Sequence, residues 1–409
     1  MTTYRVGFLG VGPRGLSQAR AYMLHPRVEV AALCDVDPER LGAAAAEFGV
    51  ERTYDDYRAM LDQENLDIVN IPTRTDLHAP LTIGVLEHRA PRAVIVEKPM
   101  ATSLTDADRM QELAEANGTR LAIHHQMRTT PTFNVADRLI NAGEIGPLTT
   151  IKIRGKGYYG GYDLLNIGTH MLNDTRRYAG HARSVVATCV TGGRPTTAAD
   201  IVEGSYGFGL LAGENISALY EFENGLTAFA EMHRRSEPGN GWMHIKIYGE
   251  DGAVCLHNSR ELFIRRGRDE VVDDTPWEKY ELADEDRYLH GHDYYDHPTG
   301  DLWMAEETVR VLDEDREHEC SGIEGRAVME MMDGAWVSHF SRSRVDFPLE
   351  RGEHPLRKEL AKAGLPEPDP ERGKLRYGDW LPGELARIEA ARQPKSGHLV
   401  VAAAEPTRL

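Results

Sequence analysis

The chain has 409 residues and a mass of 45.7 kDa, more than a single hydrophobic core usually organises, so we expect at least two domains. Apolar residues make up 41% and charged residues 27%, which excludes a disordered or collagen-like protein. Lys and Arg number 47 against 65 Asp and Glu, and the net charge of −18 repels phosphate groups and anionic membranes. We therefore expect no nucleic acid and no membrane as partner.

Cysteine usage and the first residues of the chain predict a soluble, cytoplasmic protein. The cysteines show no Cys-x-x-Cys spacing and are expected to be small buried apolar residues in a reducing compartment: Cys34, Cys189, Cys255 and Cys320. The opening sequence MTTYRVGFLGVG lacks the pattern of a secretory signal, and no stretch reaches the ~18 uncharged apolar residues of a membrane span.

Between Tyr4 and His124, short apolar runs alternate with segments of helical spacing. The runs are VGFLG, VEVAALC, DIVNIP, AVIVEKP and LAIHH. Strands that are apolar on both faces are typical of a parallel sheet covered by helices on both sides. Residues 1–124 are therefore predicted to form an α/β domain, a doubly wound Rossmann fold.

After Leu148 the pattern changes to longer segments in which apolar and polar residues alternate, such as NISALYEFENGLTAFAEMHRR. This alternation indicates antiparallel strands with one buried face, with hairpin turns at Asn224-Gly225 and Asp251-Gly252. We expect an α+β domain over residues 125–349, built on an open, mostly antiparallel sheet that serves substrate binding and oligomerisation. Residues 350–409 are rich in proline and are expected to form an extended or partly disordered C-terminal extension.

A complete dinucleotide-binding fingerprint follows the first predicted strand. The turn Gly10-Val11-Gly12-Pro13-Arg14-Gly15 opens a helical segment, and Asp35 ends the second strand 20 residues later. Glycines permit a tight turn and close approach of a pyrophosphate to the helix N-terminus, while the carboxylate accepts hydrogen bonds from the ribose hydroxyls. A carboxylate also repels a 2′-phosphate, so NAD is favoured over NADP, although Arg14 could compensate such a phosphate.

The fifth predicted strand ends in Glu97-Lys98-Pro99. Together with the fingerprint and the antiparallel second domain, this motif resembles the glucose-fructose oxidoreductase / inositol dehydrogenase (Gfo/Idh/MocA) family over about residues 4 to 349. The resemblance implies that Lys98 lies beside the nicotinamide and touches the reacting hydroxyl, and that Glu97 holds the strand end or the ribose. Partial burial beside a positive nicotinamide would lower the pKa of this lysine toward a catalytically useful range.

A second segment, YDLLNIGTHMLND over residues 162–174, matches a family helix that usually carries Asp-x-x-x-His. His170 is present, but Asn166 occupies the position of the aspartate and cannot take up a proton. The resemblance therefore leaves His170 and Lys98 as the catalytic candidates. Asn166 and Thr169 are expected to contact the substrate.

Further positions resemble family sites that line the nicotinamide, the domain crossover and the sugar. They are Thr73 and His78, Gln126 and Arg128, and Tyr158 and Tyr162 with Tyr159 between them. His290-Gly291-His292-Asp293, with His297 nearby, fits no standard zinc pattern, and we expect a structural or substrate-rim loop and no metal.

These residues predict an NAD-dependent oxidoreductase that transfers a hydride between a hydroxyl-bearing carbon of a sugar, polyol or glycoside and nicotinamide. An alternative is a redox-assisted glycosidase that oxidises, eliminates, hydrates and reduces with recycled NAD, because relatives of that kind also carry an arginine before the third glycine and a Thr-His pair without the aspartate. A non-catalytic NAD(H) sensor is a third interpretation, supported only by Asn166. The family resemblance further implies a homodimer or homotetramer.

Overall fold

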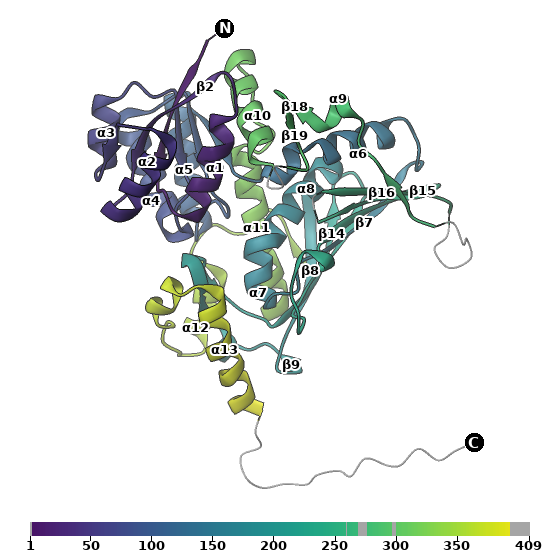
Figure 1. Ribbon diagram of the computed structural model, residues 1–409. Coiled ribbons are helices and arrows are strands. Elements are labelled where there is room, and N and C mark those ends of the chain that lie inside the picture. Colours follow the sequence, from purple (N-terminus) through teal and green to yellow (C-terminus); the bar gives the residue numbers. More distant parts are fainter. Residues whose placement is uncertain (1, 259, 269–275, 297–299, 393–409) are drawn as a thin grey trace, which may run out of the picture.

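The computed structural model describes residues 2–258, 260–268, 276–296 and 300–392. Figure 1 shows an N-terminal α/β unit beside a large sheet, with the long helices α10 and α11 between them and the last helices below. No helix among the described residues is long and apolar enough to cross a membrane. All four cysteines are buried and free, as predicted.

The N-terminal unit is a parallel sheet of six strands in the order β3-β2-β1-β4-β5-β6. The strands are β1 (Tyr4–Leu9), β2 (Val28–Cys34), β3 (Thr53–Tyr54), β4 (Ile68–Ile71), β5 (Ala93–Val96) and β6 (Arg120–Ile123). The connecting helices are α1 (Pro13–Met23), α2 (Pro38–Phe48), α3 (Tyr57–Gln63), α4 (Thr75–Arg89) and α5 (Leu104–Asn117). This order confirms the Rossmann prediction and reverses between β1 and β4, where the carboxyl ends of the strands open a ligand crevice.

The second sheet is mixed but mostly antiparallel, with ten strands of which only β7 and β13 pair in parallel. Its strands are β7 (Leu148–Arg154), β8 (Ala182–Thr191), β9 (Arg194–Pro195), β12 (Asn215–Phe222), β13 (Thr227–His233), β14 (His244–Gly249), β15 (Gly252–His257), β16 (Glu261–Arg266), β17 (Glu278–Tyr280) and β20 (Val345–Asp346). The hairpins β12–β13 and β14–β15 turn at the two predicted Asn-Gly and Asp-Gly positions.

This part of the chain also forms helices, and two small hairpins lie outside the large sheet. The helical elements are η1 (Gln126–Thr129), α6 (Pro131–Asn141), α7 (Gly160–Asp163), η2 (Leu164–Gly168), α8 (Thr169–Ala179), η3 (Ala198–Asp200), η4 (Ser205–Gly207), η5 (Asn240–Trp242), α9 (Asp284–Arg287), α10 (Asp301–Glu314) and α11 (Gly322–Ser341). The hairpins are β10 (Val202–Gly204) with β11 (Gly209–Leu211), and β18 (Tyr288–Leu289) with β19 (His292–Asp293). Helices α8 and α11 pack on one face of the sheet.

Helix α10 returns to the N-terminal unit although it follows the second sheet in the chain. Its residues Met304, Ala305 and Val309 share a buried core with β1 and α1. Just beyond α10, the carbonyl of Cys320 accepts a hydrogen bond from the amide of Ile123 at the end of β6 (2.8 Å). The two units are therefore joined by packing and by backbone pairing.

The C-terminal extension is helical, which corrects the expectation of an extended or disordered arm for its described part. It forms α12 (Pro355–Lys362), η6 (Pro370–Lys374) and α13 (Tyr377–Arg392), and residues 393–409 lie outside the described residues. Two of its prolines are compatible with helices because Pro355 and Pro370 occupy first-turn positions, where no amide donor is needed. Trp380 anchors the segment, since its ring is fully buried and its Nε1 donates to the carbonyl of Glu203 (2.8 Å).

Replacing Trp380 with Ala should destabilise the packing of the extension by about 3–5 kcal/mol, because a large buried ring is lost. We expect faster proteolysis within residues 370–392 and a lower unfolding midpoint in urea. Leu375→Ala is the matched control, since Leu375 is 39% exposed in the same segment. Equal protease resistance of both variants would contradict a docked extension.

Candidate active site

The three glycines of the turn after β1 have different roles. Gly10 has a φ of 106°, and a Cβ on Gly15 would lie 2.2 Å from the Gly10 carbonyl oxygen. Gly12 precedes Pro13, the first residue of α1, and a Cβ there would meet nothing within 4 Å. Gly10 and Gly15 are thus required by the fold itself, whereas Gly12 leaves open space where a pyrophosphate can approach the helix N-terminus.

Asp35 fixes this turn to the end of β2. Its carboxylate accepts hydrogen bonds from the amides of Val11 (2.9 Å) and Asp37 (2.9 Å) and from the guanidinium of Arg40 (2.8 Å). Burial alone would raise the pKa of Asp35, but Arg40 and the two amides outweigh it and hold the pKa below its usual value. The group is therefore ionised at neutral pH, as the predicted ribose-binding role requires.

Arg14 points into the protein and not toward the position of a 2′-phosphate beside Asp35. Its guanidinium pairs with Asp301 at the start of α10 (3.1 Å) and with Glu97 at the end of β5 (3.5 Å). Glu97 also accepts a hydrogen bond from Gln18 (2.7 Å), and both acids lie 3.9 Å from the His124 ring. Glu97 therefore belongs to a buried ionic network that joins the glycine turn, β5 and α10.

Lys98 lies at the carboxyl end of β5, next to this network. Its Nζ donates to the side-chain oxygen of Asn166 (2.7 Å) and to the Asn166 carbonyl (3.0 Å). Burial lowers the pKa of Lys98 to about 8; Glu97 opposes this shift, and Arg14 and Lys156 add to it. The amine can thus be neutral near physiological pH while it remains aimed by Asn166.

A wide helical turn presents Asn166 to Lys98. Between α7 and α8 the chain forms the π-helical segment η2, which contains Asn166. Wide turns of this kind disturb the regular backbone ladder and occur often at functional sites. Here the same residue offers both its backbone carbonyl and its amide oxygen to one amine.

His170 begins the next turn and is almost completely buried. Its ring packs edge-to-face on His125, with 5.4 Å between centroids, and its Nδ1 has no hydrogen-bond partner among the described residues. Burial, together with the charge of Lys98, holds the pKa of His170 well below its usual value. His125 shares a hydrogen bond with the hydroxyl of Thr169 (2.8 Å), so Thr169 positions that ring. At neutral pH His170 is an uncharged imidazole.

Lys156, after β7, is a second ammonium close to these residues. Burial lowers its pKa, which Asp163 partly restores, and its charge in turn lowers the pKa values of Lys98 and His170. Asp163 accepts hydrogen bonds from the amides of Lys156 (3.2 Å) and Gly157 (3.0 Å), which fixes the loop. The site therefore holds two buried lysines whose pKa values are both lowered.

Thr73 and His78, which were predicted to line the nicotinamide side of the cofactor, lie beside the glycine turn, and His78 links two loops there. A Cβ on Gly10 would lie 2.9 Å from Thr73 Cγ2, which puts Thr73 at the fingerprint. His78 is buried, and its two ring nitrogens lie 2.8 Å from the Pro99 carbonyl oxygen and 3.1 Å from the Thr73 carbonyl oxygen, so that the neutral ring can donate to either one and contacts the loops after both β4 and β5. Through its contact with Pro99, His78 supports the position of the adjacent Lys98.

Gln126 and Arg128, which were predicted to lie at the domain crossover, both form hydrogen bonds within the protein. Gln126 hydrogen-bonds the His124 ring (3.2 Å), and Arg128 donates to the carbonyl of Asn173 in α8 (2.7 Å). Burial raises the pKa of Asp174 to about 8, which Arg128 opposes. Arg128 therefore links the segment after β6 to α8, whereas the contact of Gln126 stays within that segment.

The predicted tyrosines form one wall of aromatic rings. Tyr158 and Tyr162 meet edge-to-face at 5.6 Å, and Tyr377 of the extension packs on Tyr162 at 4.2 Å and on Tyr158 at 4.9 Å. Tyr159 is fully buried against Trp380 and is part of the core. Tyr158 is the more accessible member of the predicted pair.

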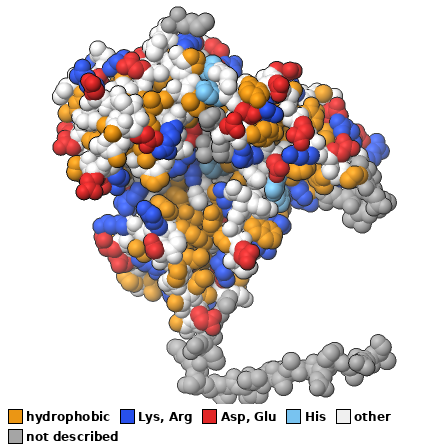
Figure 2. All heavy atoms as spheres, viewed as in Figure 1, with side chains coloured by type: hydrophobic (Ala, Val, Ile, Leu, Met, Phe, Trp, Pro, Cys, Tyr) orange, Lys and Arg blue, Asp and Glu red, His pale blue; other side chains and the backbone are white. Residues whose placement is uncertain are grey.

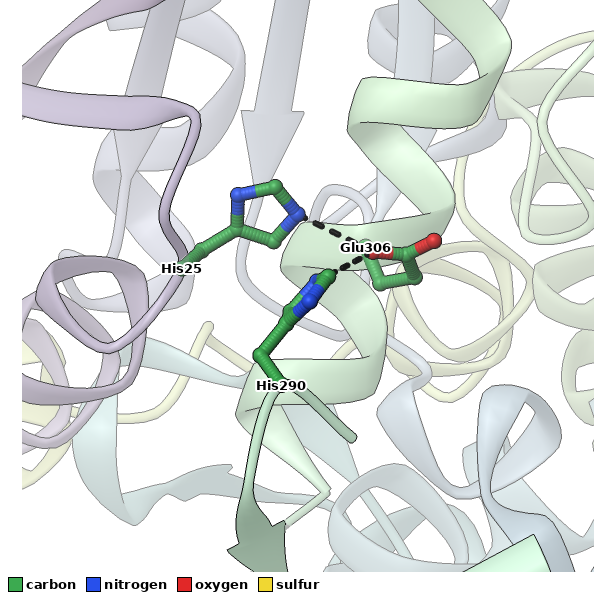
Figure 3. Close-up of side chains that lie close together, drawn as sticks. All are labelled: His25, His290 and Glu306. Atoms are coloured by element: carbon green, nitrogen blue, oxygen red, sulfur yellow. Dashed lines mark hydrogen bonds and ion pairs between the residues drawn. The ribbon is translucent and has the colours of Figure 1, made fainter. Parts of the chain in front are cut away.

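Away from Lys98, His25, His290 and Glu306 form a compact cluster (Figure 3). One carboxylate oxygen of Glu306 lies 3.0 Å from His25 Nε2 and 2.8 Å from His290 Nε2. The amide of Arg27 donates to His25 Nδ1 (3.1 Å), so the neutral His25 ring carries its proton on Nε2 and donates it to Glu306. A protonated Nε2 cannot ligate a metal, and we describe the cluster as a hydrogen-bonded link between the α1–β2 loop, the β18–β19 hairpin and α10. His297 lies outside the described residues.

Four residues of the site were missed in the sequence. They are His124, His125, Lys156 and Asp301. His124 and His125 had a usable signal, because they follow the last parallel strand at the edge where ligands bind. Lys156 and Asp301 had none, since they reach the site from the second sheet and from α10.

The N-terminal part of the chain matches a known family of oxidoreductases. A family model described as "Oxidoreductase family, NAD-binding Rossmann fold", the Gfo/Idh/MocA model, matches residues 4–125. The N-terminal domain belongs to the Gfo/Idh/MocA oxidoreductase family. The chain is 36% identical over 143 residues to D-apiose dehydrogenase from Paraburkholderia graminis, a match that covers 35% of this chain and only 38% of that protein.

Longer matches within the same family are more distant. Levoglucosan dehydrogenase from Pseudarthrobacter phenanthrenivorans is 24% identical over 300 residues, covering 64% of this chain and 75% of the relative. A solved structure of levoglucosan dehydrogenase with NADH and L-sorbose is 20% identical with a TM-score of 0.71, and covers 86% of this chain and 100% of that one. The second match shows a shared fold, and part of the present chain has no counterpart in that structure.

Substitution of the glycines should separate folding from cofactor binding. Gly15→Ala should cost about 1–3 kcal/mol of stability because its Cβ collides with a backbone carbonyl. Gly12→Ala should change stability by less than about 0.5 kcal/mol but weaken NADH binding by roughly 10-fold or more, because the methyl occupies the open space. Urea unfolding and fluorescence titration with NADH measure the two effects. Unaltered NADH affinity in Gly12→Ala would refute the assigned position of the pyrophosphate.

Proposed function

We propose that the protein is an NAD-dependent oxidoreductase that acts on a hydroxyl-bearing carbon of a sugar, polyol or glycoside. The observation that carries the proposal is Lys98, an amine with a pKa of about 8 held by Asn166 at the carboxyl edge of the Rossmann sheet. Relatives named as D-apiose and levoglucosan dehydrogenases support the same class of substrate.

In this mechanism the neutral Lys98 Nζ takes the proton of the substrate hydroxyl. Asn166 holds the amine in position, and its remaining amide hydrogens can orient a neighbouring hydroxyl. NAD, when bound, supplies the hydride acceptor. His170 is suited to hydrogen bonding as a neutral imidazole, because its low pKa makes it a poor proton acceptor. The proton therefore passes to Lys98 and not to His170.

The redox glycosidase is not favoured, because the relatives above are named as dehydrogenases. It shares the same first step, so the balance of products distinguishes the two activities. A dehydrogenase accumulates one NADH for each keto product, whereas a recycling glycosidase releases aglycone without net NADH.

We also propose a cytoplasmic homo-oligomer. The face of the large sheet opposite α8 and α11 carries a row of apolar side chains that are exposed in the single chain: Val186 (48%), Leu219 (43%) and Phe229 (38%). These residues are cross-strand neighbours on β8, β12 and β13. A continuous apolar row of this kind favours burial against a second copy of the chain.

Incubation with NAD and a panel of free sugars, polyols and glycosides, followed by NMR and absorbance at the NADH band, tests the proposed activity. We expect a keto product with stoichiometric NADH. Lys98→Met should lower turnover by about 10²–10⁴-fold, the usual contribution of a general base, while NADH still binds. Normal turnover of Lys98→Met would eliminate Lys98 as the base, and free aglycone without NADH would establish the glycosidase instead.

The pH profile should report the ionisation of Lys98. Because the neutral amine is the active form and its pKa is about 8, kcat/KM for oxidation should rise with pH and level off above about pH 8. The positive nicotinamide would move the inflection to lower pH in the complex with NAD. A Lys98→Met variant should lose this inflection in its residual activity. An inflection retained in that variant would assign it to another group.

A further inference from the structure

The C-terminal extension closes one side of the candidate active site. Tyr377, the first residue of α13, packs on Tyr162 and Tyr158, and its hydroxyl accepts a hydrogen bond from the amide of Tyr159 (2.8 Å). Trp380 is buried behind it and stacks on it with 6.0 Å between centroids. Tyr162 lies just before Asp163, which fixes the Lys156 loop. The extension thus supports the tyrosines that precede the His170 helix.

The β10–β11 hairpin carries a further tyrosine, Tyr206, beside the extension. A Cβ on Gly207 would lie 2.2 Å from Asp76 Oδ1, and one on Gly209 would lie 3.4 Å from Thr102, so the hairpin touches the first turn of α4 and the loop after β5. Tyr206, just before Gly207, has a φ of 59° and is 42% exposed. Its amide donates to the carbonyl of Leu375 in the extension (3.3 Å).

The backbone of Tyr206 is unfavourable for a bulky residue, and conformations of this kind persist where the surroundings enforce them, often at ligand sites. Burial raises the pKa values of Tyr158 and Tyr162, and Tyr206 adds to both shifts. The tyrosines are connected to the reaction centre along the chain, because Tyr162 lies four residues before Asn166, whose side-chain oxygen accepts a hydrogen bond from Lys98 Nζ (2.7 Å). Figure 2 shows a recess between the N-terminal unit and the extension, with hydrophobic side chains along its lower side.

We propose that Tyr158, Tyr206 and Tyr377 form a second subsite, which binds the ring beyond the sugar that is oxidised. The substrate is accordingly a glycoside with a cyclic aglycone or second sugar, and not a free monosaccharide or an open polyol. Aromatic faces pack against the C–H face of such a ring, and phenolic hydroxyls bond its oxygens. This inference rests on the proposed dehydrogenase function and adds the class of substrate.

The test compares kcat/KM for glucose with kcat/KM for phenyl glucoside and cellobiose, with Tyr206→Ala and Tyr206→Phe as variants. Wild-type protein should prefer the two-ring substrates. Tyr206→Ala should reduce that preference by about 10-fold, because a stacking ring is lost. Tyr206→Phe should retain most of it, which separates stacking from hydrogen bonding. Lys374→Ala is the control, since this exposed side chain pairs only with Glu371 in the described structure.

Binding of phenyl glucoside in the presence of NADH, followed by saturation-transfer NMR, gives a readout that does not depend on turnover. Loss of the aryl contacts in Tyr206→Ala supports the subsite, even if no sugar in the panel is oxidised, in which case only the proposed reaction fails. An unchanged substrate preference together with unchanged aryl contacts in Tyr206→Ala would overturn the subsite. Thermal unfolding of each variant shows whether any loss reflects folding alone.

Discussion

The buried ionic network around Arg14 is the constraint on which the site depends. One guanidinium joins the glycine turn, the end of β5 through Glu97 and the start of α10 through Asp301. Two buried carboxylates without this cation would face each other uncompensated, which is costly in a protein interior. The network therefore holds α10 against the Rossmann sheet and fixes the strand end that carries Lys98.

The same charges adjust the chemistry of Lys98. Burial lowers its pKa, Glu97 counteracts the shift, and Arg14 and Lys156 reinforce it. The result is an amine whose pKa of about 8 lies near physiological pH, the useful range for moving a proton there. Burial also lowers the pKa of His170, the charges of Lys98 and Lys156 add to this shift, and His170 therefore stays in the neutral form. One electrostatic environment thus gives the two residues different roles.

Residues carried by a contiguous motif could be predicted well. The glycine turn, Asp35, Lys98 and the Asn166–His170 segment all lie where the sequence placed them, because each belongs to a strand end or a single helix. Arg14 was anticipated near a cofactor phosphate, but its side chain turns toward Asp301, a partner 287 residues away in the chain. The extension was misread for a similar reason, since two of its prolines fit helix starts and its last helix is held by contacts of Trp380 with Glu203 and of Tyr377 with Tyr159.

The sequence by itself determined the Rossmann domain, the dinucleotide fingerprint, the antiparallel second sheet and the position of Lys98 at the end of β5. Local periodicity and glycine requirements encode these features within short stretches. Tertiary structure alone decided which charges surround Lys98, that α10 completes the N-terminal core, and that Tyr377 meets Tyr158 and Tyr162. These depend on side chains brought together from distant segments, whose pairing no local pattern records.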